Sequence, residues 1–298
     1  MSTLPLLHEL LIQPFTEFGF MRRAWIAGLA LSLSTGPVGT LLILRRLTLM
    51  GDAMSHALLP GAALGFMLAG LSLPALGLGA FVAGLLVAAL AHQVARLTAQ
   101  REESALAAFY LMALASGVML VSLKGTSVDL MHLLFGNILA ADAQTLPLVA
   151  GVASLTLLLL AIFIRPLVAD TLDPGFLRLV WPSGAGWMRP LYMLLLVTNL
   201  VAGFLTLGTL MSVGLLVLPA AAARFWSRNL GTQMVLATLI GALASTAGLL
   251  LSYHAQLPTG PAIVLSAGAV YLGSLILGRI DSLRARHLAP LTSQGDSR

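Results

Sequence analysis

The sequence predicts an all-α integral membrane protein, a polytopic bundle of about nine transmembrane helices. Hydrophobic residues make up 58% of the 298 residues and charged residues only 9%, whereas soluble domains carry about 25% charged residues. Apolar stretches of roughly 20 residues, the length of a helix that crosses a hydrocarbon core of about 30 Å, follow one another along the chain. The basic residues gather in alternate loops, as they do on the cytoplasmic side of membrane proteins.

The first 23 residues are expected to form an amphipathic segment on the membrane surface. They lack the basic start and the uninterrupted apolar core of a secretory signal. Their apolar side chains recur at helical spacing, with glutamates between them, at Leu7, Leu10, Leu11, Phe15 and Phe18. Such a helix lies in the plane of the membrane rather than across it.

The remaining stretches give nine spans, with eight as the main alternative. A continuous helix over residues 190–226 would be about 55 Å long, nearly twice the hydrocarbon thickness. We therefore expect it to fold back near Gly208, as two spans or as one span and a re-entrant helix. The largest polar insert, residues 165–189, is expected on the cytoplasmic side, with a loop over 182–186. The clear spans are 24–44, 47–70, 74–95, 105–123, 146–164, 234–251 and 261–278.

The distribution of basic residues places the N-terminus outside and the C-terminus in the cytoplasm. With nine spans, nearly all arginines then lie on the cytoplasmic side, and only Arg22, Arg23 and Lys124 remain outside. Residues 24–278 form a single transmembrane domain, because no linker interrupts them, and residues 279–298 form a basic cytoplasmic tail. The net charge of +5 therefore reflects membrane topology rather than nucleic-acid binding.

Asp52 and His56 form an ionisable pair inside a predicted span, where charged groups are costly and usually functional. On one helix they project from the same face, and this spacing is a common half-site for a divalent metal. His56 lies about 15 Å along the helix from Arg46, at the bilayer midplane. The alternative is that Asp52 caps the helix start and His56 bonds a neighbouring helix.

Four neighbours of this pair are assigned to the same pathway and its helix packing: Ser55, Pro60, Gly61 and Gly65. Pro60 cannot donate the backbone hydrogen bond that the His56 carbonyl would accept, which predicts a free carbonyl oxygen beside the pair. The two glycines form a GxxxG face that allows another helix to approach closely.

The chain lacks the motifs of an enzyme or a nucleotide motor. Its only lysine, Lys124, fits no GxxxxGK[ST] sequence, and no GxSxG, HExxH or dinucleotide signature is present. It contains no cysteine, so a metal must use oxygen, nitrogen or methionine ligands.

Four segments occur in order over residues 22–278: GPVGTLLILRRLTLMGDAMSHALLPGAALG, VSLKGTSVDLMHLLFGNIL, MSVGLLVLPAAAARFW and QLPTGPAIVL. Together they resemble the permease subunits of ATP-binding-cassette (ABC) transporters for zinc, manganese and iron. One departure is Asn137, where that family often has aspartate, so no acidic role is carried over to this position.

The resemblance implies a permease that imports a divalent zinc, manganese or ferrous ion by alternating access. It implies a homodimer in the bacterial plasma (inner) membrane, a separate cytoplasmic ATP-binding subunit for each copy and an external metal-binding solute-binding protein. The metal is the substrate, and no cofactor is expected to be bound permanently.

The resemblance also places the contact with the ATPase at the cytoplasmic end of the seventh span. The expected docking residues are Pro219, Arg224, Phe225, Trp226 and Arg228. Basic and aromatic side chains are enriched at protein interfaces. The alternative is an ordinary interfacial anchor of tryptophan and arginine.

Asp129, His132 and His254 are candidates for metal contact on the external side, although solvated loop residues are the favoured interpretation. The competing function is a secondary metal carrier or channel driven by an ion gradient. Such a carrier is expected to show more intramembrane carboxylates or a clear repeat, and the predicted spans contain only Asp52.

Overall fold

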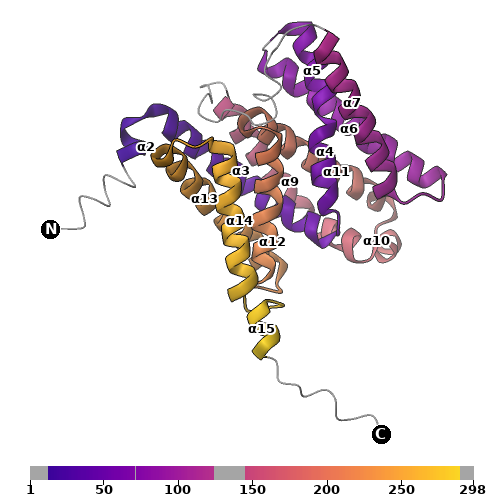
Figure 1. Ribbon diagram of the computed structural model, residues 1–298. Coiled ribbons are helices and arrows are strands. Elements are labelled where there is room, and N and C mark those ends of the chain that lie inside the picture. The colour runs from indigo at the N-terminus through magenta and orange to yellow at the C-terminus, as the bar shows by residue number, and fades with distance from the viewer. Residues whose placement is uncertain (1–12, 71, 124–144, 289–298) are drawn as a thin grey trace, which may run out of the picture.

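The computed structural model describes residues 13–70, 72–123 and 145–288, and its regular structure there is entirely α-helical (Figure 1). This confirms the prediction of an all-helical polytopic membrane protein. The helices are α2 Gln13–Glu17, α3 Gly19–Leu44, α4 Thr48–Ala57, α5 Leu59–Ala69, α6 Leu73–Leu97, α7 Glu102–Leu123, α9 Thr145–Leu172, α10 Pro174–Val180, α11 Pro182–Leu207, α12 Thr209–Arg224, α13 Leu230–Ala255, α14 Thr259–Leu277 and α15 Leu283–Leu288.

Seven described helices are long and apolar enough to cross a membrane, namely α3, α6, α7, α9, α11, α13 and α14. Nine full spans are therefore not confirmed. The predicted span 47–70 is divided into α4 and α5, and α12 has only 16 residues, which is about 24 Å of helix and less than the hydrocarbon thickness. The orientation of the termini stays a prediction.

The reversal expected near Gly208 is present. This residue separates α11 from α12 and has a φ of 84°, a backbone conformation that glycine adopts without steric cost. Ser212 of α12 lies against Gly203 of α11, so the chain turns back on itself. The loop predicted over 182–186 is wrong, because α11 already begins at Pro182, a residue that suits the first turn of a helix.

The two ends of the chain differ from the expected boundaries. Residues 1–12 of the predicted amphipathic segment and 289–298 of the tail lie outside the described residues. The first long helix begins at Gly19, before the expected 24. Trp25 in its second turn donates a hydrogen bond of 2.9 Å from Nε1 to Oγ1 of Thr246 on α13. The tail begins as the short helix α15.

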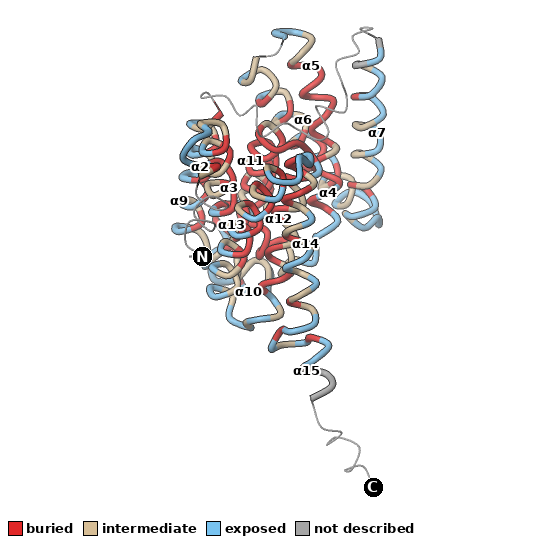
Figure 2. Tube along the Cα trace, turned by 60° about the vertical axis from the view of Figure 1, so that its left-hand side comes forward, coloured by how far each residue is buried: buried red, intermediate tan, exposed pale blue. Residues whose placement is uncertain are grey.

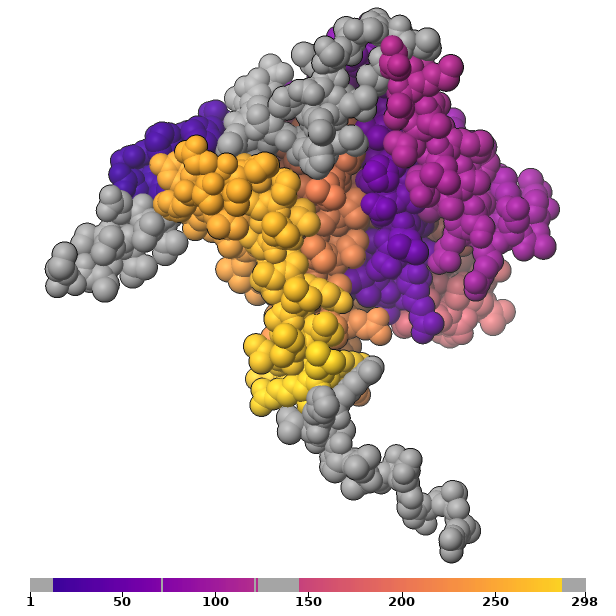
Figure 3. All heavy atoms as spheres, in the orientation of Figure 1, coloured from indigo at the N-terminus to yellow at the C-terminus, as the bar shows by residue number. Residues whose placement is uncertain are grey.

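Two helices, α3 and α11, form the centre of the bundle. They are buried over most of their length, whereas less than a third of α6, α7, α9 and α14 is buried (Figure 2). The main core joins α11 to α3, α4, α5 and α6, and its largest buried side chain is Tyr192. In the space-filling view, α14 and the α6–α7 pair lie on opposite sides of the visible face (Figure 3). The helix α4, which carries the candidate ligands, lies between them.

Candidate metal pathway

Asp52 and His56 are brought together on α4. The Oδ1 atom of Asp52 lies 3.8 Å from Nε2 of His56, and the two side chains are 66% and 32% exposed, respectively. Their separation of four residues places them one helical turn apart on one face. A carboxylate oxygen and an imidazole nitrogen are therefore available side by side, on a face that other atoms of the chain cover only partly.

The helix that holds this pair ends sooner than expected. α4 stops at Ala57, and α5 begins at Leu59 with Pro60 in its first turn, where a missing N–H costs nothing. The free carbonyl expected at His56 stays a prediction, because the backbone N–H directed to that oxygen is that of Leu58, only two residues on, rather than the helical donor four residues on that Pro60 lacks. The carbonyl of Leu58 in turn accepts from Ala62 at 3.0 Å.

His56 is held between two helices and keeps one nitrogen without a partner. Its ring stacks against Tyr110 of α7, with ring centroids 6.4 Å apart. Its Nδ1 atom is buried and has no hydrogen-bond partner within the described part of the chain. The alternative interpretation of Asp52 as a helix cap is not supported, since the N-cap of α4 is Leu47. Buried polar atoms normally have partners, so an unpaired imidazole nitrogen here is consistent with a ligand role.

Asp52 also lines a cavity of about 210 Å³ between α4 and the start of α7. Glu102, Glu103 and Tyr110 line the same cavity, and the sequence interpretation missed these carboxylates. Two adjacent glutamates at the start of an apolar span were the available signal. The described residues nevertheless hold no group of three or more His, Asp or Glu side chains close enough to bind a metal. One chain therefore offers two ligands rather than a complete site.

The neighbours of the pair serve the helix itself and its packing. Ser55 donates from Oγ to the carbonyl of Asp52 at 2.7 Å, so its hydroxyl is already used. A Cβ atom on Gly61 would collide with the carbonyl of Gly79, and one on Gly65 with that of Ala75. These two glycines therefore bring α5 into backbone contact with α6. Pro60 meets α7 in the same way, at Gly117.

The turn after α12 uses its aromatic residues internally. Phe225 packs on Tyr271 with ring centroids 5.9 Å apart, and Trp226 donates from Nε1 to Oγ of Ser274 at 2.9 Å. Both contacts fix the turn on α14. Arg224 and Arg228 are exposed, and Trp226 keeps 39% of its surface exposed despite its hydrogen bond. Pro219 lies buried inside α12, so it neither begins the helix nor reaches this surface.

The short helix α10, which directly precedes α11, exposes apolar side chains. The sequence interpretation missed this surface. Phe176 is 57% exposed, Leu179 84% and Val180 66%. The helix is capped by Asp173, whose carboxylate accepts from the backbone N–H of Phe176 at 2.9 Å. The positions i, i+3 and i+4 form one stripe, and this spacing was the available signal.

Of the three external candidates, only His254 lies within the described residues. Asp129 and His132 lie within 124–144, outside the described residues. His254 belongs to the last turn of α13 and stands edge-on to the Tyr253 ring at 5.1 Å. The helix α13 contributes no residue to the cavity that Asp52 lines.

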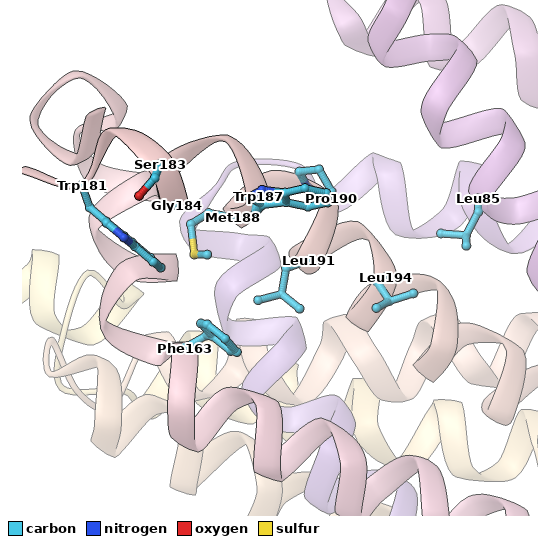
Figure 4. A pocket seen from close by; sticks show the side chains of 10 residues that line it. All are labelled: Leu85, Phe163, Trp181, Ser183, Gly184, Trp187, Met188, Pro190, Leu191 and Leu194. Atoms are coloured by element: carbon cyan, nitrogen blue, oxygen red, sulfur yellow. The ribbon is translucent and has the colours of Figure 1, made fainter. Parts of the chain in front are cut away.

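A larger hollow of about 610 Å³ lies along α11 and is bounded by Phe163 of α9 and Leu85 of α6 (Figure 4). Trp181 and Trp187 stand at one end of it, and Leu191 and Leu194 continue it along the helix. It is lined almost entirely by apolar atoms and by no titratable side chain. The hollow therefore offers no carboxylate or imidazole to a metal, and the ionisable pair stays on α4.

Known proteins resemble this chain over nearly its whole length. It is 35% identical over 270 residues to the manganese import system permease protein ScaB of Streptococcus parasanguinis, covering 89% of this chain and 93% of that protein. It is 31% identical over 262 residues to the manganese transport system membrane protein MntC of Listeria innocua, covering 88% and 92%. The solved structure of PsaBC from Streptococcus pneumoniae in complex with Fab has a TM-score of 0.81 and 33% identity, covering 93% and 97%.

The family description "ABC 3 transport family" matches residues 17–278. This agrees with the four ordered motifs and with the seven helices of spanning length. The chain therefore belongs to the ABC 3 transport family, as a multi-pass permease of a metal ABC transporter in the bacterial inner membrane.

Proposed function

We propose that this permease imports a divalent transition metal, Mn²⁺ first among the candidates, by way of Asp52 and His56. The observation that carries the proposal is the approach of Asp52 Oδ1 to His56 Nε2 at 3.8 Å. Oxygen and nitrogen ligands suit Mn²⁺, and they also suit Zn²⁺ and Fe²⁺. The names of the relatives, both manganese permeases, favour Mn²⁺. The metal is substrate and does not stay bound.

Two copies of the chain complete the metal shell in this proposal. One copy offers only two side-chain ligands, and Asp52 leaves most of its carboxylate uncovered. A second copy facing the first would supply another pair, which water or carbonyl oxygens extend to an octahedral shell. Alternating access then consists of exposing this shared site to one side of the membrane at a time.

Energy and delivery come from separate subunits. The sequence has no P-loop, so ATP is hydrolysed by a cytoplasmic ATPase on each copy. We propose that the ATPase contacts both the turn after α12, through Arg224 and Arg228, and the apolar stripe of α10. The turn alone is a weak anchor, because Phe225 and Trp226 are already packed on α14. An external solute-binding protein delivers the metal.

The test is metal uptake by the complete transporter in reconstituted vesicles. Wild-type permease with its ATPase and binding protein is expected to take up Mn²⁺ only when ATP is present. Asp52→Ala and His56→Ala are each expected to lower that uptake at least about tenfold, the effect of losing 1.4 kcal/mol of ligand binding. Asp281→Ala is the control, because this exposed carboxylate does not line the cavity and belongs to none of the candidate sites.

Three outcomes would contradict the proposal. Normal uptake by both alanine variants, with intact assembly, would remove the ligand role. Loss of uptake in Asp281→Ala to the same degree would show a general defect instead. Uptake by the permease alone, driven by an ion gradient without ATP, would favour the secondary carrier.

A further inference from the structure

An ion pair between α7 and α11 stands at the edge of the Asp52 cavity. The guanidinium of Arg189 contacts the carboxylate of Glu102, whose other oxygen lies 3.6 Å from Nδ1 of His92 on α6. Glu102 is only 19% exposed, and Arg189 is 40% exposed. The pair therefore joins α11 to the first residue of α7 in a partly covered position, where it is screened less than a surface pair.

The same carboxylate belongs to the cavity wall. Glu102 lines the hollow of about 210 Å³ together with Asp52 and Glu103. Paired with Arg189, Glu102 is neutralised, and a guanidinium that is not itself part of the lining stands next to this wall of the cavity. Released from Arg189, it would present a carboxylate to a departing cation. A cation leaving Asp52 by this cavity therefore meets either a positive or a negative group, depending on the ion pair.

The helix α7 connects this ion pair to the metal ligands. Tyr110, which stacks on His56, lies eight residues after Glu102, or about 12 Å along the helix. A shift of the first turns of α7 would therefore be felt at the imidazole ring. The pair Asp52–His56 and the ion pair Arg189–Glu102 thus contact the same helix.

The other partner is linked to α10, the helix proposed to contact the ATPase. Arg189 lies in the second turn of α11, which begins directly after α10 and Trp181. The indole of Trp181 packs so closely on Gly184 that a Cβ atom there would collide with it. The junction of α10 with α11 is therefore tightly packed, and a movement of α10 would carry Arg189 with it.

We propose that the Arg189–Glu102 ion pair is a latch that closes the cytoplasmic end of the Asp52 cavity and opens when the ATPase moves α10. This inference rests on the proposed metal transport function. With the latch closed, the positive guanidinium blocks the exit of a cation. With the latch open, Glu102 becomes free to accept the cation from Asp52. Two discrete arrangements of one ion pair suit a switch of this kind.

The test measures Mn²⁺ leaving preloaded vesicles without ATP, with the permease reconstituted beside its ATPase. Arg189→Gln is expected to raise this passive efflux about tenfold over wild type, because it removes the guanidinium and frees the Glu102 carboxylate. Glu102→Gln keeps the guanidinium and removes the accepting carboxylate, so it is expected not to raise efflux. The double variant Glu102→Arg/Arg189→Glu restores the pair with reversed charges and is expected to return efflux to within about twofold of wild type. Glu103→Gln is the matched control, because Glu103 lines the same cavity and makes no ion pair with Arg189.

A reversible cross-link between the two positions gives a second test of the latch. The chain has no cysteine, so Glu102→Cys/Arg189→Cys introduces the only two thiols. A reducible bifunctional thiol reagent is expected to abolish both passive efflux and ATP-driven uptake in this variant, and a reductant is expected to restore them. Each single cysteine variant, treated in the same way, should keep transporting.

The outcomes separate the latch from the transport function. Wild-type vesicles that show no ATP-driven uptake would overturn the proposed function itself. Wild-type uptake together with wild-type efflux in Arg189→Gln, or a leak of about tenfold in Glu102→Gln, would overturn the latch alone. Continued transport by the cross-linked double cysteine variant would overturn the latch as well. So would a passive efflux in Glu103→Gln equal to that in Arg189→Gln.

Discussion

The ring of Tyr110 on α7 lies over the imidazole of His56 on α4, with planes inclined by 29° and centroids 6.4 Å apart. The Nε2 atom of the same imidazole lies 3.8 Å from Oδ1 of Asp52. His56 is therefore oriented by an aromatic ring from one helix and faces a carboxylate of its own helix. A metal ligand needs such support, because a freely rotating imidazole loses entropy when it binds.

Replacing Tyr110 tests this support. Tyr110→Ala is expected to raise the Mn²⁺ concentration for half-maximal uptake about two- to tenfold, since aromatic stacking contributes about 0.5–1.5 kcal/mol. Tyr110→Phe keeps the ring and is expected to stay near wild type. The measurement is ATP-driven uptake over a range of Mn²⁺ concentrations. Equal losses in both variants would show that the hydroxyl, rather than the ring, is required.

The contact between α5 and α6 gives a stability prediction. Gly61→Ala places a methyl group against the backbone of Gly79, so the helices must separate. Overpacking of this kind costs about 1–3 kcal/mol. The thermal unfolding midpoint of the detergent-purified protein is expected to fall.

Gly268 of α14 is the matched control, because a Cβ atom there meets nothing within 4 Å. Gly268→Ala is expected to leave the midpoint unchanged or to raise it slightly, since alanine favours the helix. A midpoint for Gly61→Ala that equals that of Gly268→Ala would contradict the close approach of α5 and α6.

A break between helices could be predicted from the sequence only where an apolar stretch is too long for one membrane span. Residues 190–226 are too long for one span, and a glycine was present to absorb the turn, so the reversal at Gly208 was predictable. The break at Leu58 was not, because Pro60 fits either a kinked helix or the first turn of a new one. The packing of α5 on α6 and α7 decides between them, and that packing is a tertiary contact.

The site was predictable to the extent that it is local. Asp52 and His56 lie four residues apart, so helical geometry alone brings them together. Glu102 reaches the same cavity from another helix, and its partner Arg189 lies 87 positions further along the chain. No periodicity connects such residues. The hydrogen bond from the Trp226 indole to Ser274 was not predictable for the same reason, and the docking role of Trp226 stays a prediction.

A second ion pair predicts a structural rather than a transport effect. Arg45 Nη2 lies 2.9 Å from Asp170 Oδ2, and the two side chains are only 10% and 14% exposed. The guanidinium also lies over the Tyr192 ring, 4.5 Å from its centroid. Asp170→Asn leaves Arg45 covered without a counter-charge and is expected to lower the free energy of unfolding by about 3 kcal/mol.

The double variant Arg45→Met/Asp170→Leu removes both charges. It is expected to recover much of that loss, because apolar side chains can replace a buried ion pair without large cost. Denaturant unfolding of the purified protein measures both variants. The single variants Arg45→Met and Asp170→Leu complete the comparison. If the free energy of unfolding of the double variant falls by the sum of the losses in these two single variants, the charges are not coupled.

The surface that binds the ATPase can be located by comparing α10 with the turn after α12. Leu179→Asp places a charge in the exposed apolar stripe and is expected to weaken ATPase binding at least about tenfold, since burial of one leucine contributes about 1.5–3 kcal/mol. Arg224→Ala removes one exposed charge and is expected to weaken binding only about two- to threefold. Leu283→Asp on α15 is the control, with a leucine that is 51% exposed outside both surfaces. Affinity is measured by titrating the purified ATPase onto permease in nanodiscs. Wild-type affinity in Leu179→Asp together with a large loss in Arg224→Ala would show that the ATPase binds the turn after α12 rather than α10. In that case α10 could not transmit a movement of the ATPase to Arg189.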